Sequence, residues 1–233
     1  MNPKRAARPA VLLDFGGTLD ADGIPWKERA RRLFRAARLA VPADEFDPAF
    51  HAADDALVGT ISRTLPFEAT VEALFHGLAR GLGLLEAEPI AVRLARQFIA
   101  ESRAHLQANG SVLEGLAERY RLGIVSNFYG NLARVCADTG IARYFDVLVD
   151  SACVGHRKPE PAIFHRALDA LGVKPDSAVF VGDSLERDMA GARRVLIRHV
   201  WLTPGDPTSP FRGGCCPGDR VIHSLRELDG VLP

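Results

Sequence analysis

A carboxylate and a tight turn stand at the end of the first short apolar run of this chain. Asp14 stands within the short apolar run Val11–Phe15, and the pair Gly16 and Gly17 follows. Backbone amides in such a turn can surround an anion. The carboxylate itself can act as a nucleophile or as a metal ligand. The segment therefore suits chemistry on an anionic substrate.

A hydroxyl, an amide and a cation follow two later apolar runs. Ser126 and Asn127 lie near the start of an expected helix, where free backbone N–H groups favour phosphate. Lys158 follows the next run and is one of only four lysines in a chain whose other basic residues are arginines. An ammonium group is a compact cation that can neutralise charge on a phosphoryl group.

Two further aspartates complete a set that suits a divalent cation. Asp183 follows a fourth apolar run, and Asp188 comes five residues later. Mg²⁺ takes a few carboxylates and keeps oxygens of water and substrate as its other ligands. Asp14 and Asp183, each at the end of an expected strand, meet that requirement.

The elements that would position these residues alternate between strands and helices. Strands are expected at 11–15, 122–126, 145–150, 178–181 and 199–202, with a short last strand at 220–222. Helices are expected at 131–140, 161–171 and 185–195. This alternation predicts an α/β fold with a Rossmann-like parallel sheet wrapped on both faces. Ligands of such sheets sit at the carboxyl ends of the strands.

Residues 21–111 carry no convincing strand and read instead as a helical insert. Apolar residues recur at helical spacing in the segments 26–39, 67–82 and 89–107, and 50–58 reads as a shorter helix. We therefore expect a core made of 1–20 and 112–233, with roughly four helices inserted between its first two strands. The segment 203–219 is rich in proline and glycine and reads as a loop.

Composition excludes some function classes. Lysine plus arginine equals aspartate plus glutamate, at 29 each among 233 residues, so net charge indicates no nucleic-acid or membrane partner. The apolar run near the N-terminus is too short for a signal peptide or a membrane span. The four cysteines, including the adjacent Cys215 and Cys216, form no CxxC pair and are expected to be free thiols. Cytoplasmic residence is the simple interpretation.

The four polar groups, in this order and each after an expected strand, resemble the four motifs of the haloacid dehalogenase superfamily. The resemblance covers roughly residues 8–20 and 112–233, and the insert is similar to the superfamily's helical cap of the first type. It implies a magnesium-dependent hydrolase with Asp14 as nucleophile. The implied reaction is hydrolysis of a small phosphorylated metabolite through an aspartyl-phosphate.

The resemblance also implies a role for each site residue. The implied metal ligands are Asp14, the carbonyl of Gly16, Asp183 and Asp188. The groups implied to bind substrate are the Gly17 amide, Ser126 and Asn127. Lys158 would neutralise the phosphate and the charge of the nucleophile, while Thr18 would orient Asp14.

The chain departs from the superfamily pattern at Gly16. Phosphatases of this superfamily usually carry an aspartate two residues after the nucleophile, where it protonates the leaving oxygen and then activates water. General acid–base catalysis contributes about 10²–10⁴ in rate, so its loss should impair hydrolysis of alkyl phosphates most. A turn that requires positive φ is one alternative reason for a glycine here. Substitute acids are sought among Asp20, Asp22, His51, Asp54 and His76.

Three alternatives remain open from the sequence. A phosphonatase-like enzyme needs a lysine that forms a Schiff base, and Lys27 is the only lysine of the insert. A dehalogenase-like enzyme is disfavoured by Gly182 and Asp183, a metal-site pattern that metal-free enzymes do not need. A homologue without turnover would bind a phosphorylated ligand or a protein.

Overall fold

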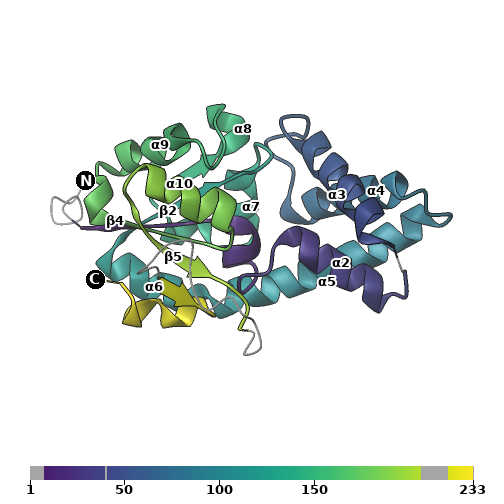
Figure 1. The fold of residues 1–233 in the computed structure, drawn as a ribbon, viewed down its shortest axis with the longest axis horizontal. Coiled ribbons are helices and arrows are strands. Elements are labelled where there is room, and N and C mark those ends of the chain that lie inside the picture. The colour runs from purple at the N-terminus through teal and green to yellow at the C-terminus, as the bar shows by residue number, and fades with distance from the viewer. Residues whose placement is uncertain (1–7, 40, 206–219, 233) are drawn as a thin grey trace.

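The computed structural model describes residues 8–39, 41–205 and 220–232. Its centre is a sheet of six strands in the order β3-β2-β1-β4-β5-β6 (Figure 1). Every neighbouring pair of strands is parallel, which confirms the predicted α/β fold. The strands are β1 (Ala10–Leu13), β2 (Arg121–Ser126), β3 (Val147–Asp150), β4 (Ala178–Gly182), β5 (Arg198–Leu202) and β6 (Arg220–Ile222).

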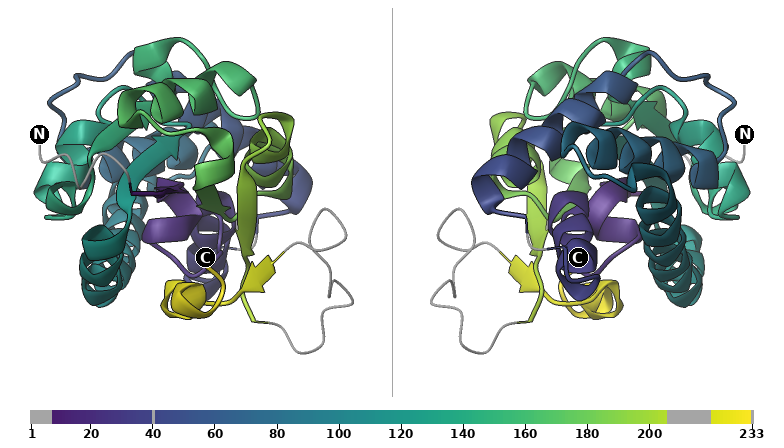
Figure 2. Two further views of the ribbon diagram at one scale, coloured as in Figure 1. Left: turned by 90° about the vertical axis from the view of Figure 1, so that its left-hand side faces the viewer. Right: turned by 90° about the vertical axis from the view of Figure 1, so that its right-hand side faces the viewer.

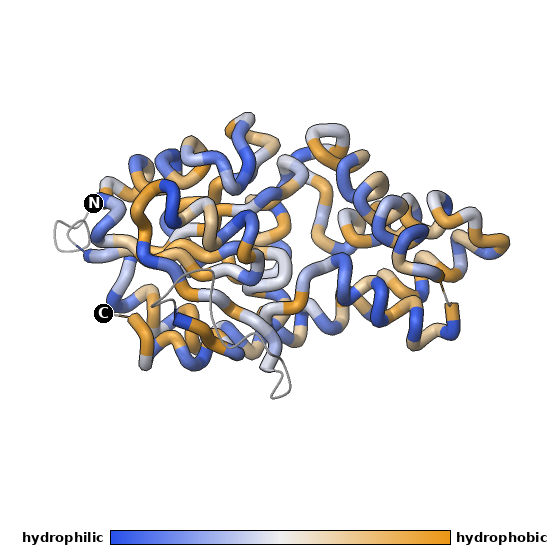
Figure 3. The backbone as a smooth tube through the Cα atoms, viewed as in Figure 1, coloured by the Kyte–Doolittle hydropathy of each residue, from blue (hydrophilic) through white to orange (hydrophobic). Residues whose placement is uncertain are grey.

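The two central strands are apolar because both of their faces are covered. Every residue of β1 and β4 is buried. Leu12 packs on one side with residues of α9 (Pro161–Leu171) and α10 (Ala190–Arg194). Val11 and Leu13 pack on the other side, in a cluster that includes residues of α6 (Gly110–Arg119) and α7 (Leu132–Asp138). Continuous apolar runs are typical of parallel strands buried in this way, and Figure 3 shows them passing through the sheet.

Of the five α-helices that the structure describes between β1 and β2 in the chain, four lie beside the sheet in space. They are α2 (Trp26–Ala36), α3 (Ala43–Leu57), α4 (Phe67–Gly81) and α5 (Ala87–Ala108), and Figure 1 shows them on the right. We call them the insert helices. Helix α3 begins seven residues earlier than the sequence prediction, which placed its start at 50. Asp44 and Glu45 stand in its first turn, where negative charge stabilises a helix N-terminus.

Two other segments differ from the sequence prediction. Helix α6 directly follows α5 and was not predicted, because its few apolar residues merge with the periodicity of the preceding helix. The expected helix at 185–195 is instead a wide helical turn, η4 (Leu185–Met189), followed by the short α10.

The remaining short elements complete the chain. Helix α8 (Ser151–Val154) follows β3, and single turns lie at Phe15–Leu19 (η1), Ala142–Tyr144 (η2), Pro175–Ser177 (η3) and Leu225–Gly230 (η5). Strand β6 pairs with β5 and forms one edge of the sheet (Figure 2). Cys215 and Cys216 lie outside the described residues. Within the described part, no helix is both long and apolar enough to span a membrane.

Candidate active site

Asp14 lies directly after β1, at the carboxyl edge of the sheet, and only one of its oxygens is hydrogen-bonded. Its Oδ1 atom accepts from the Phe15 amide at 2.7 Å and from the Ser126 hydroxyl at 2.7 Å. The Lys158 ammonium lies 2.8 Å from the same oxygen. No hydrogen bond to Oδ2 occurs within the described residues, so this oxygen is free to meet a metal ion or a substrate. The side chain is 7% exposed and lines a cavity.

Lys158 is held between two carboxylates. Its ammonium lies 2.8 Å from Asp14 and 2.7 Å from Asp188. Asn127 fixes the backbone of Lys158: its Oδ1 accepts from the Lys158 amide at 2.7 Å and its Nδ2 donates to the Lys158 carbonyl at 3.1 Å. Burial alone would lower the pKa of Lys158, but the charges of Asp14 and Asp188 outweigh it and raise that pKa. The lysine therefore stays charged in a buried position.

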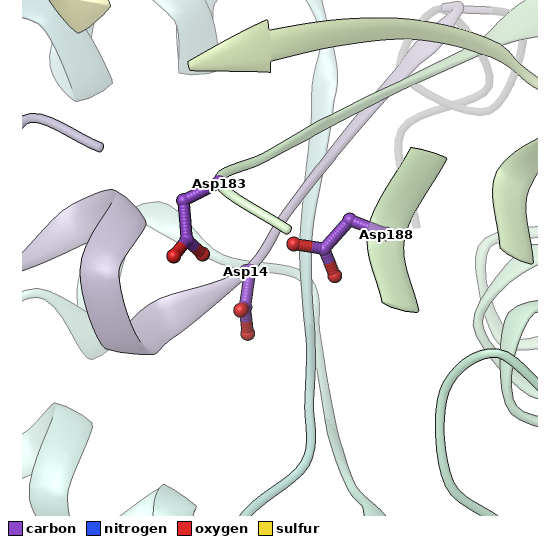
Figure 4. A group of neighbouring side chains, drawn as sticks. All are labelled: Asp14, Asp183 and Asp188. Carbon is purple, nitrogen blue, oxygen red and sulfur yellow. The ribbon is translucent and has the colours of Figure 1, made fainter. Parts of the chain in front are cut away.

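Three buried aspartates gather beside this lysine. Ligand atoms of Asp14, Asp183 and Asp188 all lie within 4.8 Å of one another (Figure 4). Burial raises the pKa of Asp183 well above its ordinary value, and the charges of Asp188 and Asp14 add to the shift. Burial also raises the pKa of Asp188, against the opposing charge of Lys158.

The cluster fits a divalent cation. The Oδ2 atom of Asp183 is buried and has no hydrogen-bond partner in the part of the chain that the structure describes. A buried carboxylate oxygen without a partner is unfavourable unless it is paired with a cation or a donor. Lys158 supplies one positive charge to three carboxylates, so the site has room for two more. Gly16, whose carbonyl was the fourth expected ligand, lines the same cavity.

The turn after Asp14 arranges two residues differently from the roles that the resemblance implied. The Thr18 hydroxyl lies 3.4 Å from Asp183 Oδ1, and it makes no hydrogen bond to Asp14 within the described residues. The Gly17 amide donates to Asp20 at 2.8 Å and would have to leave that bond to bind a phosphoryl oxygen. Gly17 has φ +87°, and a Cβ atom there would lie 2.5 Å from Asp183, so this position requires glycine.

Gly16 does not have the backbone conformation that would explain a glycine. Its φ is −75°, which any residue adopts, so the alternative based on positive φ is wrong. A Cβ atom at this position would instead lie 3.2 Å from Nε1 of Trp26. The indole of α2 thus lies in the space that a side chain at residue 16 would enter.

Asp20 is excluded as a substitute acid by its hydrogen bonds. It is fully buried and accepts from the Gly17 amide and, at 2.8 Å, from the Trp26 indole. Arg29 donates at 2.8 Å and Ser102 at 2.9 Å. A carboxylate with four donors and no exposed surface cannot exchange protons with a substrate. Sequence analysis missed this structural role, although Arg29 and Trp26 on one helix were a signal for it.

The other candidate acids divide into two groups. Asp22 pairs with His105 at 3.6 Å, and His76 pairs with Glu88 at 2.9 Å; neither lines the cavity that contains Asp14. Asp54 and His51, both on α3, do line that cavity.

The cavity has a volume of about 450 Å³ and lies between the carboxyl edge of the sheet and the insert helices. Its lining residues on the core include Asp14, Gly16, Ser126 and Lys158. Its lining residues on the insert helices include Trp26, Phe50, His51 and Asp54. A second cavity of about 290 Å³ adjoins it, and the two share Asp54, Asn127, Phe128, Tyr129 and Arg187. The site can hold a phosphoryl group at Asp14 and a small leaving group beneath the insert.

Lys27 also lines the cavity, but its ammonium is engaged. It donates to Asp47 at 2.9 Å and lies 3.4 Å from the His51 ring. The hydrogen bond from Lys27 to Asp47 is the largest of the contributions that lower the pKa of Asp47. A paired ammonium is a poor Schiff-base nucleophile, because that reaction needs a neutral amine.

Comparison with known proteins identifies the family. A family model described as "haloacid dehalogenase-like hydrolase" matches residues 9–195. The chain belongs to this family of hydrolases. It is 32% identical over 237 residues to the "Phosphoserine phosphatase" of Thermus thermophilus, covering 94% of this chain and 90% of that protein. It is also 32% identical over 142 residues to the bovine "Haloacid dehalogenase-like hydrolase domain-containing protein 3", of which the match spans 57%.

Solved structures of this hydrolase family are similar over nearly the whole chain. The crystal structure of a "HAD phosphatase" from Thermococcus onnurineus is 26% identical, with a TM-score of 0.55, over 96% of this chain and 97% of that one. A 2-haloacid dehalogenase from Pseudomonas syringae is 25% identical, with a TM-score of 0.52, over 97% and 98% of the two chains. Relatives of this hydrolase therefore include both phosphatases and dehalogenases.

Proposed function

We propose that this hydrolase is a magnesium-dependent phosphatase that acts on a small phosphorylated metabolite through an aspartyl-phosphate on Asp14. The relatives named as phosphatases support a phosphorylated substrate. We also propose that the insert helices form the cap over the core, with the boundaries expected from the sequence, and that the protein is cytoplasmic.

One observation carries the proposal: a nucleophile with one free oxygen lies beside a charged lysine and two further buried carboxylates. Asp14 Oδ1 is fixed by Ser126 and Lys158, while Oδ2 is free. The unpaired oxygen of Asp183 favours a metal ion in the same cluster. A metal-free dehalogenase has no use for this arrangement, which favours the phosphatase.

The residues divide the chemistry among them. Mg²⁺ held by Asp14, Asp183 and Asp188 would supply positive charge against the phosphoryl oxygens. One carboxylate oxygen of Asp14 attacks phosphorus and the other would be the ligand of the ion, while Ser126 and Lys158 hold the carboxylate in line. Lys158 also balances the charge that develops on the transferred group, and Asn127 keeps the lysine backbone in place. Thr18 holds Asp183.

The absence of a carboxyl group at residue 16 predicts an order of substrates. Acyl and aryl leaving groups depart without a proton, whereas an alkoxide does not. Unless another residue donates that proton, we expect hydrolysis to be impaired on alkyl phosphates relative to acyl and aryl phosphates.

Initial rates with Mg²⁺ on an acyl, an aryl and an alkyl phosphate test this function. We expect turnover of the first two and slower turnover of the third. EDTA should abolish all three rates, and added Mg²⁺ should restore them. No turnover of any phosphate would refute the proposal and favour a homologue that only binds its ligand.

A further inference from the structure

A phosphatase without a carboxyl group at residue 16 still needs a proton for a poor leaving group, and outside the aspartate cluster two carboxyl groups, Asp54 and Glu186, line its cavity. Glu186 is exposed on the core turn η4, whereas Asp54 is half-buried and is fixed by a hydrogen bond, so Asp54 is the better placed of the two. Asp20 is engaged by four donors, and Asp22 lies outside the cavity. Asp14 is the nucleophile. Asp54, on the insert helix α3, lines the cavity with Asp14 and also lines the adjoining one.

Asp54 is positioned by one hydrogen bond. The Tyr129 hydroxyl donates to its Oδ1 atom at 2.5 Å. No hydrogen bond to Oδ2 occurs within residues 8–39, 41–205 and 220–232, so that oxygen can meet a ligand. Tyr129 is itself rigidly packed: its ring centroid lies 4.8 Å from that of Phe128 and 6.4 Å from that of Trp26. The carboxyl group thus has a fixed support and a free oxygen.

Asp54 and the nucleophile line the same cavity from different parts of the fold. Asp14 projects into the cavity from the sheet, and Asp54 borders it from α3. Arg187 lines the same cavity. Burial lowers the pKa of its guanidinium, but nearby carboxylates raise that pKa overall; they are Asp14, Asp188, Asp183 and Asp54. A phosphoryl group bound at Asp14 by in-line attack directs its leaving oxygen away from the nucleophile, into the space that Asp54 borders.

The electrostatic surroundings suit a proton donor. Burial raises the pKa of Asp54, while the Tyr129 hydrogen bond lowers it; the charge of Asp55 raises it, and Arg187 and His51 lower it. A raised pKa places a carboxyl group nearer to the pH at which it can both give and take a proton.

We propose that Asp54 is the catalytic acid and base of this hydrolase, acting from the insert in place of the residue missing at position 16. The proposal rests on the proposed function. In the first step, Asp14 bonds to phosphorus, the bond from phosphorus to the leaving oxygen breaks, and that oxygen takes the proton of Asp54. In the second, the Asp54 carboxylate takes a proton from water, whose oxygen displaces Asp14 and releases phosphate.

Kinetics of Asp54→Asn on an aryl and an alkyl phosphate test this role. The value of kcat/KM reports the steps up to departure of the leaving group. We expect it to fall by about 10²-fold or more on the alkyl phosphate and to stay unchanged on 4-nitrophenyl phosphate. Because water activation also needs Asp54, kcat should fall on both, with a burst of 4-nitrophenol. Asp44→Asn, at an exposed position in the first turn of the same helix and outside both cavities, should change neither.

The pH profile gives a second readout that a structural role would not move. Only the protonated form of Asp54 can protonate the leaving oxygen, so kcat/KM on the alkyl phosphate should fall as pH rises through its raised pKa. The groups that act most strongly on Asp54 are Tyr129, Asp55, Arg187 and His51. The other charged or titratable groups that line its two cavities, besides those of the aspartate cluster, are Lys27, His156, Arg157, Lys158, Glu160 and Glu186. The Tyr129 hydrogen bond stabilises the carboxylate, so Tyr129→Phe should move this alkaline limb to higher pH.

Three outcomes would overturn the role of Asp54. The first is an unchanged kcat/KM of Asp54→Asn on the alkyl phosphate. The second is an equal loss of kcat/KM on the alkyl and the aryl phosphate in a folded Asp54→Asn variant. The third is a wild-type enzyme that hydrolyses the aryl phosphate and not the alkyl phosphate. In each case aryl turnover by the wild type leaves the proposed phosphatase standing. Absence of aryl turnover by the wild type would refute the phosphatase and this role with it.

Discussion

Gly16 and the indole of Trp26 lie against each other beside Asp14. The backbone of residue 16 accepts any side chain, but the nearest atom to an added Cβ is the indole nitrogen at 3.2 Å. That nitrogen also donates to Asp20 at 2.8 Å, so the ring cannot turn away without loss of a buried hydrogen bond. The glycine is thus a consequence of the indole position.

A double-mutant cycle tests this pairing. Gly16→Ala should destabilise the protein by about 1–3 kcal/mol, because it overpacks a filled space. In a Trp26→Ala background the same change should be neutral or should stabilise by about 0.4–1 kcal/mol, since alanine restricts the unfolded chain. Urea unfolding of the four proteins measures both values. Equal effects of Gly16→Ala in the two backgrounds would contradict the pairing.

The sequence identified the residues whose place is set by a strand end, and missed those whose role is set by hydrogen bonds. The structure brings Asp14, Lys158, Asp183 and Asp188 together because parallel strands align their carboxyl ends. Asp20 was one of five candidate acids, since nothing in its spacing indicates how many donors surround it.

A buried ion pair links the wide turn η1 to two insert helices. Asp20, at the end of the turn, bonds Arg29 of α2, and Arg29 in turn donates to the Phe98 carbonyl and the Ser102 hydroxyl of α5. The guanidinium carbon also lies 3.8 Å from the centroid of the Phe98 ring. One side chain therefore connects the turn that follows Asp14 to both helices.

Removal of this arginine should destabilise the whole protein. Arg29→Met leaves Asp20 buried without its cation, and breaking a buried pair in this way costs about 3–5 kcal/mol. Arg32→Met is a matched control on the same helix, because Arg32 pairs with Glu28 on an exposed face and such pairs contribute little. Thermal unfolding measures both. A similar, small decrease of the unfolding temperature in both variants would show that the buried pair does not stabilise the contact between the turn and the insert helices.

At this scale the sequence predicted most elements, and errors arose where apolar spacing is ambiguous. The strands followed from continuous apolar runs between glycines and polar residues. Helix α6 was missed because the pair Asn109 and Gly110, which is typical of a turn, stands at its start, although the chain continues there as a helix. The Asn109 side chain donates to the Leu19 carbonyl at 3.0 Å, a contact between distant segments that no local pattern indicates.

Across the whole molecule, the insert helices and one face of the sheet share a single hydrophobic core. Val11 and Leu13 of the sheet belong to the same cluster as residues of every insert helix. Phe15 joins the two parts, with ring centroids 6.4 Å from Phe67 and 5.5 Å from Phe128. The cavity therefore has packed walls on both sides, and a pair such as Asp54 and Tyr129, distant in sequence, could not be predicted from spacing.

The central claim is that a phosphoryl group passes through Asp14. Wild-type enzyme and Asp14→Asn are mixed with Mg²⁺ and an aryl phosphate, quenched in acid within the first turnovers, and digested for mass mapping. We expect a phosphoryl group on the peptide that carries Asp14 in the wild type. Asp14→Asn should carry no adduct and no activity, with an unchanged circular dichroism spectrum. Wild-type turnover by Asp14→Asn, or an adduct on another residue, would contradict the account.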